Sequence, residues 1–255
     1  MTLRPFEQRV AIVTGAGKGT GGIGRTIALR LARGGAKVML ADIDPKVAES
    51  AEELRAEGAE AASHAGSLAA ELMVAAMVEG TIKRWGRVDI LINNAGGGII
   101  RPFLEHDAES LTETLARNLW STIWCCHKVL PHMVRQNYGR IVNIGADSLR
   151  TGIADHAGYN AAKGGVNGLM TALAREFSAY DITINTVAPC VVNTPRFRAL
   201  KQSNPSLAAH FEGVVPKGRA AEMEEIAALV CFLAQEDAGF ITGQEVSING
   251  GSAMP

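Results

Sequence analysis

A tyrosine and a lysine, Tyr159 and Lys163, stand four positions apart in a stretch rich in alanine and glycine. In a helix this spacing places both side chains on one face. A phenol with its ordinary pKa of about 10 is a poor base at neutral pH, but a nearby ammonium stabilises the phenolate and lowers that pKa. The pair therefore predicts acid/base chemistry, with Tyr159 carrying the proton and Lys163 tuning its pKa.

A glycine-rich turn at 15–24 separates an apolar stretch from a helical one. Glycines let backbone N–H groups at a helix N-terminus approach a pyrophosphate closely. Asp42 ends the next apolar stretch, where a carboxylate would accept hydrogen bonds from a ribose 2′-hydroxyl and repel a 2′-phosphate. The turn predicts a dinucleotide site for NAD. NADP is the alternative cofactor, because the Lys18 ammonium in this turn could pair with the 2′-phosphate.

Short apolar runs alternate with longer stretches of helical period along the chain. The runs are 10–14, 37–41, 88–94, 140–145, 182–188 and 245–250, with a weaker one at 59–63. The helical stretches are 25–33, 45–57, 69–84, 107–136, 157–179 and 222–235. The alternation predicts an α/β fold, a Rossmann-type doubly wound parallel sheet of about seven strands with helices on both faces. Ligands of such sheets bind beyond the carboxyl ends of the strands.

The length of 255 residues fits one large domain that spans 1–255. The least regular segment, 190–216, contains three prolines and a weakly helical middle. Because it follows the carboxyl end of a predicted strand, we expect it to form a lid over the site.

Composition and charge restrict the partners. The formal net charge of -1 offers no general attraction to nucleic acid or to anionic lipid. No apolar run is long enough to span a membrane and the start shows no signal-peptide pattern, so we expect a cytoplasmic protein with a small-molecule partner. The four cysteines lack CxxC spacing and the six histidines lack ligand spacing, which predicts buried free thiols and no metal site.

Several stretches together resemble the short-chain dehydrogenase/reductase family, over nearly the whole chain. They are Thr14-Gly15 with the glycine turn, Asn93-Asn94-Ala95-Gly96, Asn118 in "ARNLW", Tyr159-x-x-x-Lys163 and "APCVVNT" at 188–194. The resemblance implies hydride transfer between a nicotinamide cofactor and an alcohol or carbonyl carbon. It also implies that Lys163 holds the nicotinamide ribose and that Asn118 holds a water linking Lys163 to solvent.

The same resemblance suggests further cofactor contacts. Gly15, Gly22 and Gly24 would be the structural glycines of a turn about three residues longer than usual, with Ile23 touching the cofactor; Gly15, Gly19 and Gly21 are the alternative set. Ser67 could reach the adenine. The remaining expected contacts are Asn94, Ala95, Gly96, Pro189, Val192 and Thr194.

One departure from the family pattern concerns catalysis. The family usually has a serine thirteen positions before the tyrosine, where it binds the substrate oxygen, and this chain has Ala146 there. Ser148 could replace it if the intervening loop is shorter than assumed. Loss of such a donor costs about 10²–10³ in rate. The sequence therefore leaves two readings, an active oxidoreductase or a cofactor-binding protein with impaired catalysis, its alanine natural or engineered.

The predicted substrate pocket has an apolar wall that suits a hydrophobic or cyclic secondary alcohol or ketone. Its expected lining is Ala146, Leu149, Arg150, Cys190 and Val191, with Gly97, Ile99 and the lid. Arg150, with Arg196 and Arg198 of the lid, could bind a carboxylate, a phosphate or a coenzyme A thioester, or could remain solvated at the surface. The loop "ADSLRTG" is similar to that of family members acting on alicyclic hydroxyacyl-CoA substrates.

Oligomerisation is a further expectation. The C-terminal stretch "FITGQEVSINGGSAMP" resembles the tail through which tetramers of the family pack, and the helices expected at 107–136 and 157–179 carry long apolar faces. Most of those apolar residues could equally pack on the protein's own sheet. We expect a homotetramer.

Overall fold

The computed structural model describes residues 4–18 and 22–254. Its centre is a parallel sheet of seven strands in the order β3-β2-β1-β4-β5-β6-β7. The strands are β1 (Val10–Thr14), β2 (Lys37–Asp42), β3 (Ala61–Ala65), β4 (Ile90–Asn93), β5 (Gly139–Ile144), β6 (Ile182–Pro189) and β7 (Glu245–Ile248). The predicted fold class is confirmed.

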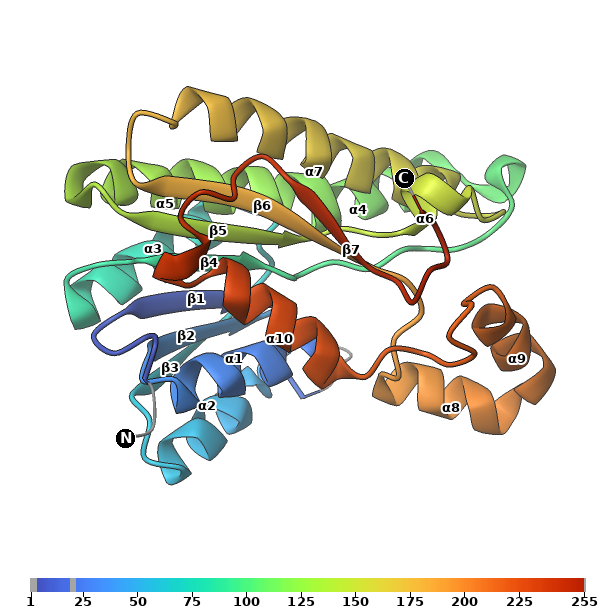
Figure 1. Ribbon diagram of the computed structural model, residues 1–255, viewed down its shortest axis with the longest axis horizontal. Coiled ribbons are helices and arrows are strands. Elements are labelled where there is room, and N and C mark those ends of the chain that lie inside the picture. The colour runs from blue at the N-terminus through green and yellow to red at the C-terminus, as the bar shows by residue number, and fades with distance from the viewer. Residues whose placement is uncertain (1–3, 19–21, 255) are drawn as a thin grey trace.

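Helices cover both faces of this sheet, because its strands are apolar on both sides. One layer holds α1 (Ile23–Arg33), α2 (Val47–Ala56) and α10 (Met223–Leu233), and the other holds α3 (Glu71–Trp85), α5 (Ser121–Gln136) and α7 (Ala157–Glu176) (Figure 1). Along β1, Ala11 and Val13 pack toward the first layer and Ile12 toward the second. The core is therefore two apolar clusters with the sheet between them.

The direction in which successive strands are added to the sheet reverses between β1 and β4. Strands β1, β2 and β3 run outward to one side, and β4 is the other neighbour of β1. At such a switch point the loops that follow β1 and β4 diverge and leave a crevice beyond the carboxyl ends of the strands. The glycine turn and the Asn94–Gly98 loop lie on either side of it.

The prediction of one continuous helix over 107–136 is wrong. The structure has α4 (Ala108–Leu115), a π-helical turn η2 (Ala116–Trp120) and then α5. In the π turn the Ser121 N–H donates to the Ala116 carbonyl, five residues back, where an α-helix would use the fourth. Asn118 lies in this turn, and its Nδ2 donates to the Thr114 carbonyl at 2.8 Å.

Other boundaries shift by a few residues. Strand β3 lies two positions later than expected; its alanine, serine and histidine side chains give little periodic signal. The expected lid contains two short helices rather than a weakly helical middle, α8 (Pro195–Ser203) and α9 (Pro205–Gly213). Each begins with a proline after an N-cap side chain, Thr194 or Asn204, that accepts a backbone N–H. In Figure 1 these two helices project beyond the sheet.

Three cysteines, Cys125, Cys126 and Cys231, are buried free thiols, and Cys190 is partly exposed. Burial raises the pKa of Cys126 and of Cys231 to about 12. None of the helices within 4–18 and 22–254 is both long and apolar enough to cross a membrane.

Candidate active site

Tyr159 and Lys163 lie one turn apart on α7, as expected. Lys163 is only 4 % exposed, and its Nζ donates to the Ile144 carbonyl at the end of β5, at 2.7 Å. The same Nζ lies 5.7 Å from the centre of the Tyr159 ring. The backbone of Gly98 comes so close to this ring that a Cβ there would be 3.0 Å from the Tyr159 Cγ. The pair is thus held between β5 and the loop after β4.

The pKa of Tyr159 differs from the expectation. Burial raises the pKa of Tyr159 to about 12 and lowers the pKa of Lys163 to about 8. Desolvation disfavours the charged form of each group, and here it outweighs the attraction that an ammonium would exert on a phenolate. Burial therefore moves the pKa of Tyr159 in the direction opposite to the one expected from its spacing to Lys163.

Asn118 is fully buried and binds the loop after β4. Its Oδ1 accepts from the Gly97 N–H and its Nδ2 donates to the Gly97 carbonyl, both at 3.1 Å. A Cβ on Gly96 would collide with Asn118 Oδ1, so the close approach requires glycine there. The Asn118 carbonyl accepts from the Thr122 hydroxyl at 2.8 Å. The side chain thus shapes the loop that faces Tyr159.

Ala146, where the family resemblance leads us to expect a serine, is 6 % exposed. Ser148 begins the short helix α6 (Ser148–Thr151), and its hydroxyl donates to Asn160 Oδ1 on α7 at 2.6 Å. Asn160 Nδ2 in turn donates to the Ser148 carbonyl at 3.0 Å. The expected substitute hydroxyl is therefore occupied by Asn160, a partner that the sequence reasoning missed.

The glycines chosen from the sequence lie where the backbone needs them. Gly15 has φ +64° and Gly22, the N-cap of α1, has φ +89°. A Cβ on Gly24 would collide with the Gly15 carbonyl and lie 2.5 Å from Asn94 Nδ2. The alternative glycines, Gly19 and Gly21, lie outside the described residues. Such a cradle, which any Cβ would fill, fits a pyrophosphate at the start of α1.

Thr14 and Asn94 connect the two loops that border the crevice. The Thr14 hydroxyl accepts from the N–H groups of Asn94 and Ala95, each at 2.9 Å. Asn94 Nδ2 donates to the carbonyls of Thr14 and Gly15, each at 3.0 Å. Asn94 and Ala95 therefore fix the glycine turn against β4, and Gly96 follows beside Asn118.

Asp42 lies at the carboxyl end of β2, 2 % exposed, next to the glycine turn. Its carboxylate accepts from the Gly17 N–H at 2.8 Å and from the Asp44 N–H at 3.0 Å. The Gly66 N–H donates to the Asp42 carbonyl, which brings exposed Ser67 to the same edge. Lys18 pairs with Glu53 at 2.6 Å and Glu49 at 3.5 Å on α2. Asp42 thus borders the glycine turn, whereas the Lys18 ammonium is paired with carboxylates of α2.

The end of β6 leads into the segment that carries α8. Pro189 ends β6, and its carbonyl accepts from the Asp147 N–H at 3.0 Å. Val192 pairs with Ala221 in an isolated bridge, and the Thr194 hydroxyl accepts from the Phe197 N–H as the cap of α8. Cys190, beside Val191, borders a hollow of about 140 Å³.

Arg150 is bound to groups within the protein. Its guanidinium donates to the Ser247 hydroxyl and pairs with Glu245 at 3.1 Å, both on β7. Leu149, beside it on α6, packs near Gly164 of α7. The sequence could not reveal this pairing, because the partners are 95 and 97 positions away.

Asp147 is a buried carboxylate that the sequence reasoning did not single out. Asn249 Nδ2 donates to its Oδ1 at 2.8 Å, and the Ser252 hydroxyl donates to its Oδ2. With the Asp147 N–H on Pro189, these bonds tie the α6 loop, the end of β6 and the C-terminal tail together beside Cys190.

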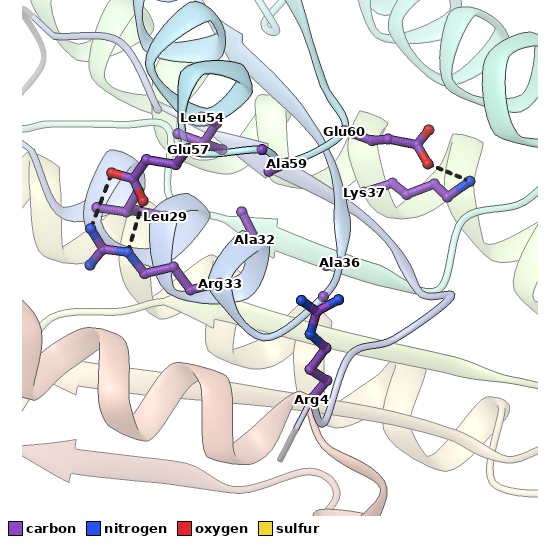
Figure 2. A pocket seen from close by; sticks show the side chains of 12 residues that line it. Arg4, Leu29, Ala32, Arg33, Ala36, Lys37, Leu54, Glu57, Ala59 and Glu60 are labelled. Atoms are coloured by element: carbon purple, nitrogen blue, oxygen red, sulfur yellow. Dashed lines mark hydrogen bonds and ion pairs between the residues drawn. The ribbon is translucent and has the colours of Figure 1, made fainter. Parts of the chain in front are cut away.

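A larger hollow, about 370 Å³, lies at the amino ends of the strands, away from these residues. Figure 2 shows two ion pairs at this hollow, Arg33 with Glu57 and Lys37 with Glu60. Within the described ranges no group of three or more His, Cys, Asp and Glu side chains could hold a metal ion.

Comparison with known proteins agrees with this geometry. A family model described as "Enoyl-(Acyl carrier protein) reductase" matches residues 17–253. The 2,3-dihydroxy-2,3-dihydro-p-cumate dehydrogenase of Pseudomonas putida is 51 % identical over 252 residues, which cover 98 % of this chain and 96 % of the relative. The (2S)-[(R)-hydroxy(phenyl)methyl]succinyl-CoA dehydrogenase subunit BbsD of Thauera aromatica is 37 % identical over 98 % of each chain.

The fold is also found among solved structures. The crystal structure of levodione reductase superposes with a TM-score of 0.90 at 35 % identity and covers 98 % of this chain and 100 % of that chain. The chain belongs to the short-chain dehydrogenase/reductase family, which confirms the resemblance. It is therefore an oxidoreductase that acts on CH–OH groups with a nicotinamide cofactor.

Proposed function

We propose that this protein is an NAD-dependent dehydrogenase that oxidises one hydroxyl of a dihydroxycyclohexadiene carboxylate. The observation that carries the proposal is the 51 % identity, over 98 % of the chain, to a dehydrogenase whose named substrate is a dihydroxy-dihydro-p-cumate. That name describes a ring with two neighbouring hydroxyls and a carboxylate. A cyclic alcohol of this kind suits the apolar wall of the predicted pocket.

In the proposed mechanism Tyr159 is the acid/base. Its phenolate accepts the substrate hydroxyl proton during oxidation, and the resulting phenol returns that proton during reduction. Lys163, close to the Tyr159 ring, stabilises the phenolate and holds the nicotinamide ribose. Asn118 shapes the loop facing Tyr159 and holds the water that links Lys163 to solvent. The nicotinamide, when bound, takes up or supplies the hydride.

For the cofactor we propose NAD. Asp42 accepts the hydrogen bond of a ribose 2′-hydroxyl, and Gly15, Gly22 and Gly24 admit the pyrophosphate with Ile23 beside it. The other proposed cofactor contacts are Ser67, Asn94, Ala95, Gly96, Pro189, Val192 and Thr194. Ala146, Leu149, Cys190 and Val191 line the substrate side, and Arg196 and Arg198 of the lid provide positive charge for the carboxylate. A single domain, a homotetramer and a cytoplasmic location stay predictions.

Two specific observations favour other candidates. The buried Ala146 and the Ser148 hydroxyl bound to Asn160 favour a cofactor-binding protein with impaired catalysis. The relative that acts on a succinyl-CoA derivative favours a coenzyme A thioester as substrate. Because the dihydroxy-dihydro-p-cumate dehydrogenase is 51 % identical and the succinyl-CoA dehydrogenase subunit only 37 %, we place the dihydroxy carboxylate first.

The test is NADH absorbance with three substrates at equal concentration. They are a dihydroxycyclohexadiene carboxylate, its coenzyme A thioester, and cyclohexanol. We expect the free carboxylate to have the highest kcat/KM, and Tyr159→Phe to abolish its turnover. Preference for the thioester, or NAD binding without turnover of any alcohol, would favour the corresponding alternative.

A further inference from the structure

His156 precedes α7 and lies against Tyr159. The two rings meet edge to face, with centroids 6.2 Å apart and planes at 69°. His156 is only partly buried, so its imidazole is accessible from outside the protein. The proposed acid/base pair does not use this side chain.

The tautomer of His156 follows from its neighbour. Its Nδ1 lies 2.7 Å from the Ala154 carbonyl oxygen. A carbonyl oxygen can only accept, so Nδ1 carries the hydrogen. In the neutral ring Nε2 is then left with a free lone pair, which gives the ring that lies against Tyr159 a hydrogen-bond acceptor.

The backbone immediately before His156 adopts a strained conformation. Asp155 has φ +64°, a left-handed conformation that costs a residue with a Cβ about 1 kcal/mol. Its carbonyl accepts from the Arg101 N–H at 3.3 Å, in the loop that also contains Gly98. The loop that covers the Tyr159 ring thus also fixes the turn that presents His156. Strain of this kind is typical of functional sites.

We propose that His156 recognises the second hydroxyl of a vicinal diol while Tyr159 binds the first. This inference rests on the proposed function, because it assumes a dihydroxy substrate. Two cis hydroxyls project from the same ring face on adjacent carbons, so one can donate to Tyr159 and the other to His156 Nε2. In a trans diol the second hydroxyl points to the opposite face. His156 therefore selects cis diols over trans diols and over single alcohols.

The size of the effect follows from the exposure of the site. A neutral hydrogen bond at a partly exposed site changes affinity by about tenfold, because water replaces the missing partner. We expect this factor in the ratio of kcat/KM for a cis diol to kcat/KM for the matched alcohol that lacks the second hydroxyl. It should appear in KM more than in kcat, because the second hydroxyl does not react.

The experiment compares three variants of the full chain. His156→Phe keeps an aromatic ring beside Tyr159 and removes the acceptor, whereas His156→Gln restores an acceptor oxygen. His127→Gln is the control, an exposed histidine on α5 whose ring packs on Trp124. The substrates are a cis-dihydroxycyclohexadiene carboxylate, its trans isomer, and the carboxylate without the second hydroxyl. Binding of catechol and of phenol, measured by titration, gives a readout without turnover.

We expect His156→Phe to lower the ratio of cis diol to single alcohol about tenfold, and His156→Gln to recover part of it. A ratio within twofold of the unmodified protein in His156→Phe would overturn the inference. If the unmodified protein oxidises no diol at all, the proposed function fails. The preference for catechol over phenol then decides the role of His156, which is supported only if His156→Phe removes that preference.

Discussion

Ser148 and Asn160 bind each other twice, through the Ser148 hydroxyl on Asn160 Oδ1 and through Asn160 Nδ2 on the Ser148 carbonyl. The exchange joins α6 to α7 immediately beside Tyr159. A serine hydroxyl has one hydrogen, so while it donates to Asn160 it cannot donate to a substrate oxygen. The oxygen-binding donor of the site is therefore best tested at two positions, 146 and 148.

We expect Ala146→Ser to raise kcat by about 10- to 100-fold, because it places a hydroxyl donor at the usual position. Ser148→Ala should change kcat less than threefold while lowering the free energy of unfolding by about 1–2 kcal/mol, through loss of the bond to Asn160. Steady-state kinetics and urea unfolding of both variants make the test. A 100-fold loss of kcat in Ser148→Ala would instead identify Ser148 as the donor.

Tyr159→Phe removes the proton carrier and keeps the ring. We expect kcat to fall by at least about 10²–10⁴, the usual contribution of general acid/base catalysis. The affinity for NADH, followed by its fluorescence, should stay within about twofold, because the pyrophosphate cradle is formed by the glycine turn. Residual turnover at a tenth of the original rate would show that another group carries the proton.

Burial of Lys163 makes stability depend on pH. Its pKa is 10.5 unfolded and about 8 in the folded protein. Between these values the unfolded chain binds the proton and the folded chain does not, so this group adds stability as pH rises from 8 to 10. Below pH 8 its destabilising effect is fully present.

Relative to Lys163→Met, the unmodified protein should gain about 1.4 kcal/mol of unfolding free energy per pH unit across that window. Urea unfolding at pH 7.5, 8.5 and 9.5 measures the difference. The buried thiols of Cys125, Cys126 and Cys231 also titrate above pH 8 when unfolded, but they do so in both proteins. Parallel curves for the two proteins would mean that Lys163 keeps its ordinary pKa.

Two glycines in helices should respond oppositely to alanine. In Gly24→Ala the new Cβ meets the Gly15 carbonyl and Asn94, so the turn must open and NADH affinity should fall at least about tenfold. Gly80 lies in α3, exposed, with open space at its Cβ position, and Gly80→Ala should raise stability by about 1 kcal/mol. NADH titration and thermal unfolding compare the two. Equal behaviour would contradict the close approach of α1 to Gly15.

The preference for NAD should depend on the carboxylate of Asp42. We expect Asp42→Ser to lower kcat/KM for NAD and to raise the ratio of NADP to NAD use by about tenfold or more, because repulsion of a 2′-phosphate is removed. Part of the loss with NAD will come from the Gly17 N–H, which donates to this carboxylate. Kinetics with both cofactors provide the measurement. An unchanged ratio would place the selectivity elsewhere.

The sequence was informative where a local pattern has one structural outcome. Unbroken apolar runs between helical stretches required a parallel sheet covered on both faces, and the spacing of Tyr159 and Lys163 required one helix face. The glycine turn was equally direct, because a positive φ at Gly22 and a close approach at Gly24 both exclude a Cβ.

The features that the sequence did not predict depend on residues that are distant in sequence and close in the fold. The π turn at 116–120 accompanies the bonds of Asn118 to Gly97, 21 positions earlier. The partners of Arg150 on α6 could not be foreseen, because Glu245 and Ser247 lie on β7, far along the chain. The pKa of Tyr159 depends on how deeply α7 is buried, and no spacing rule contains that quantity.

The two hydrogen bonds between the Asn118 side chain and the Gly97 backbone have a consequence for local unfolding of the protein. Three successive glycines, Gly96 to Gly98, have more backbone entropy to lose than any other tripeptide, so this loop does not hold its own shape. A side chain from the π turn holds it, and any fluctuation that withdraws Asn118 also exposes the Gly97 amide. The rate of deuterium uptake at the Gly97 amide therefore reports how often this loop separates from Asn118.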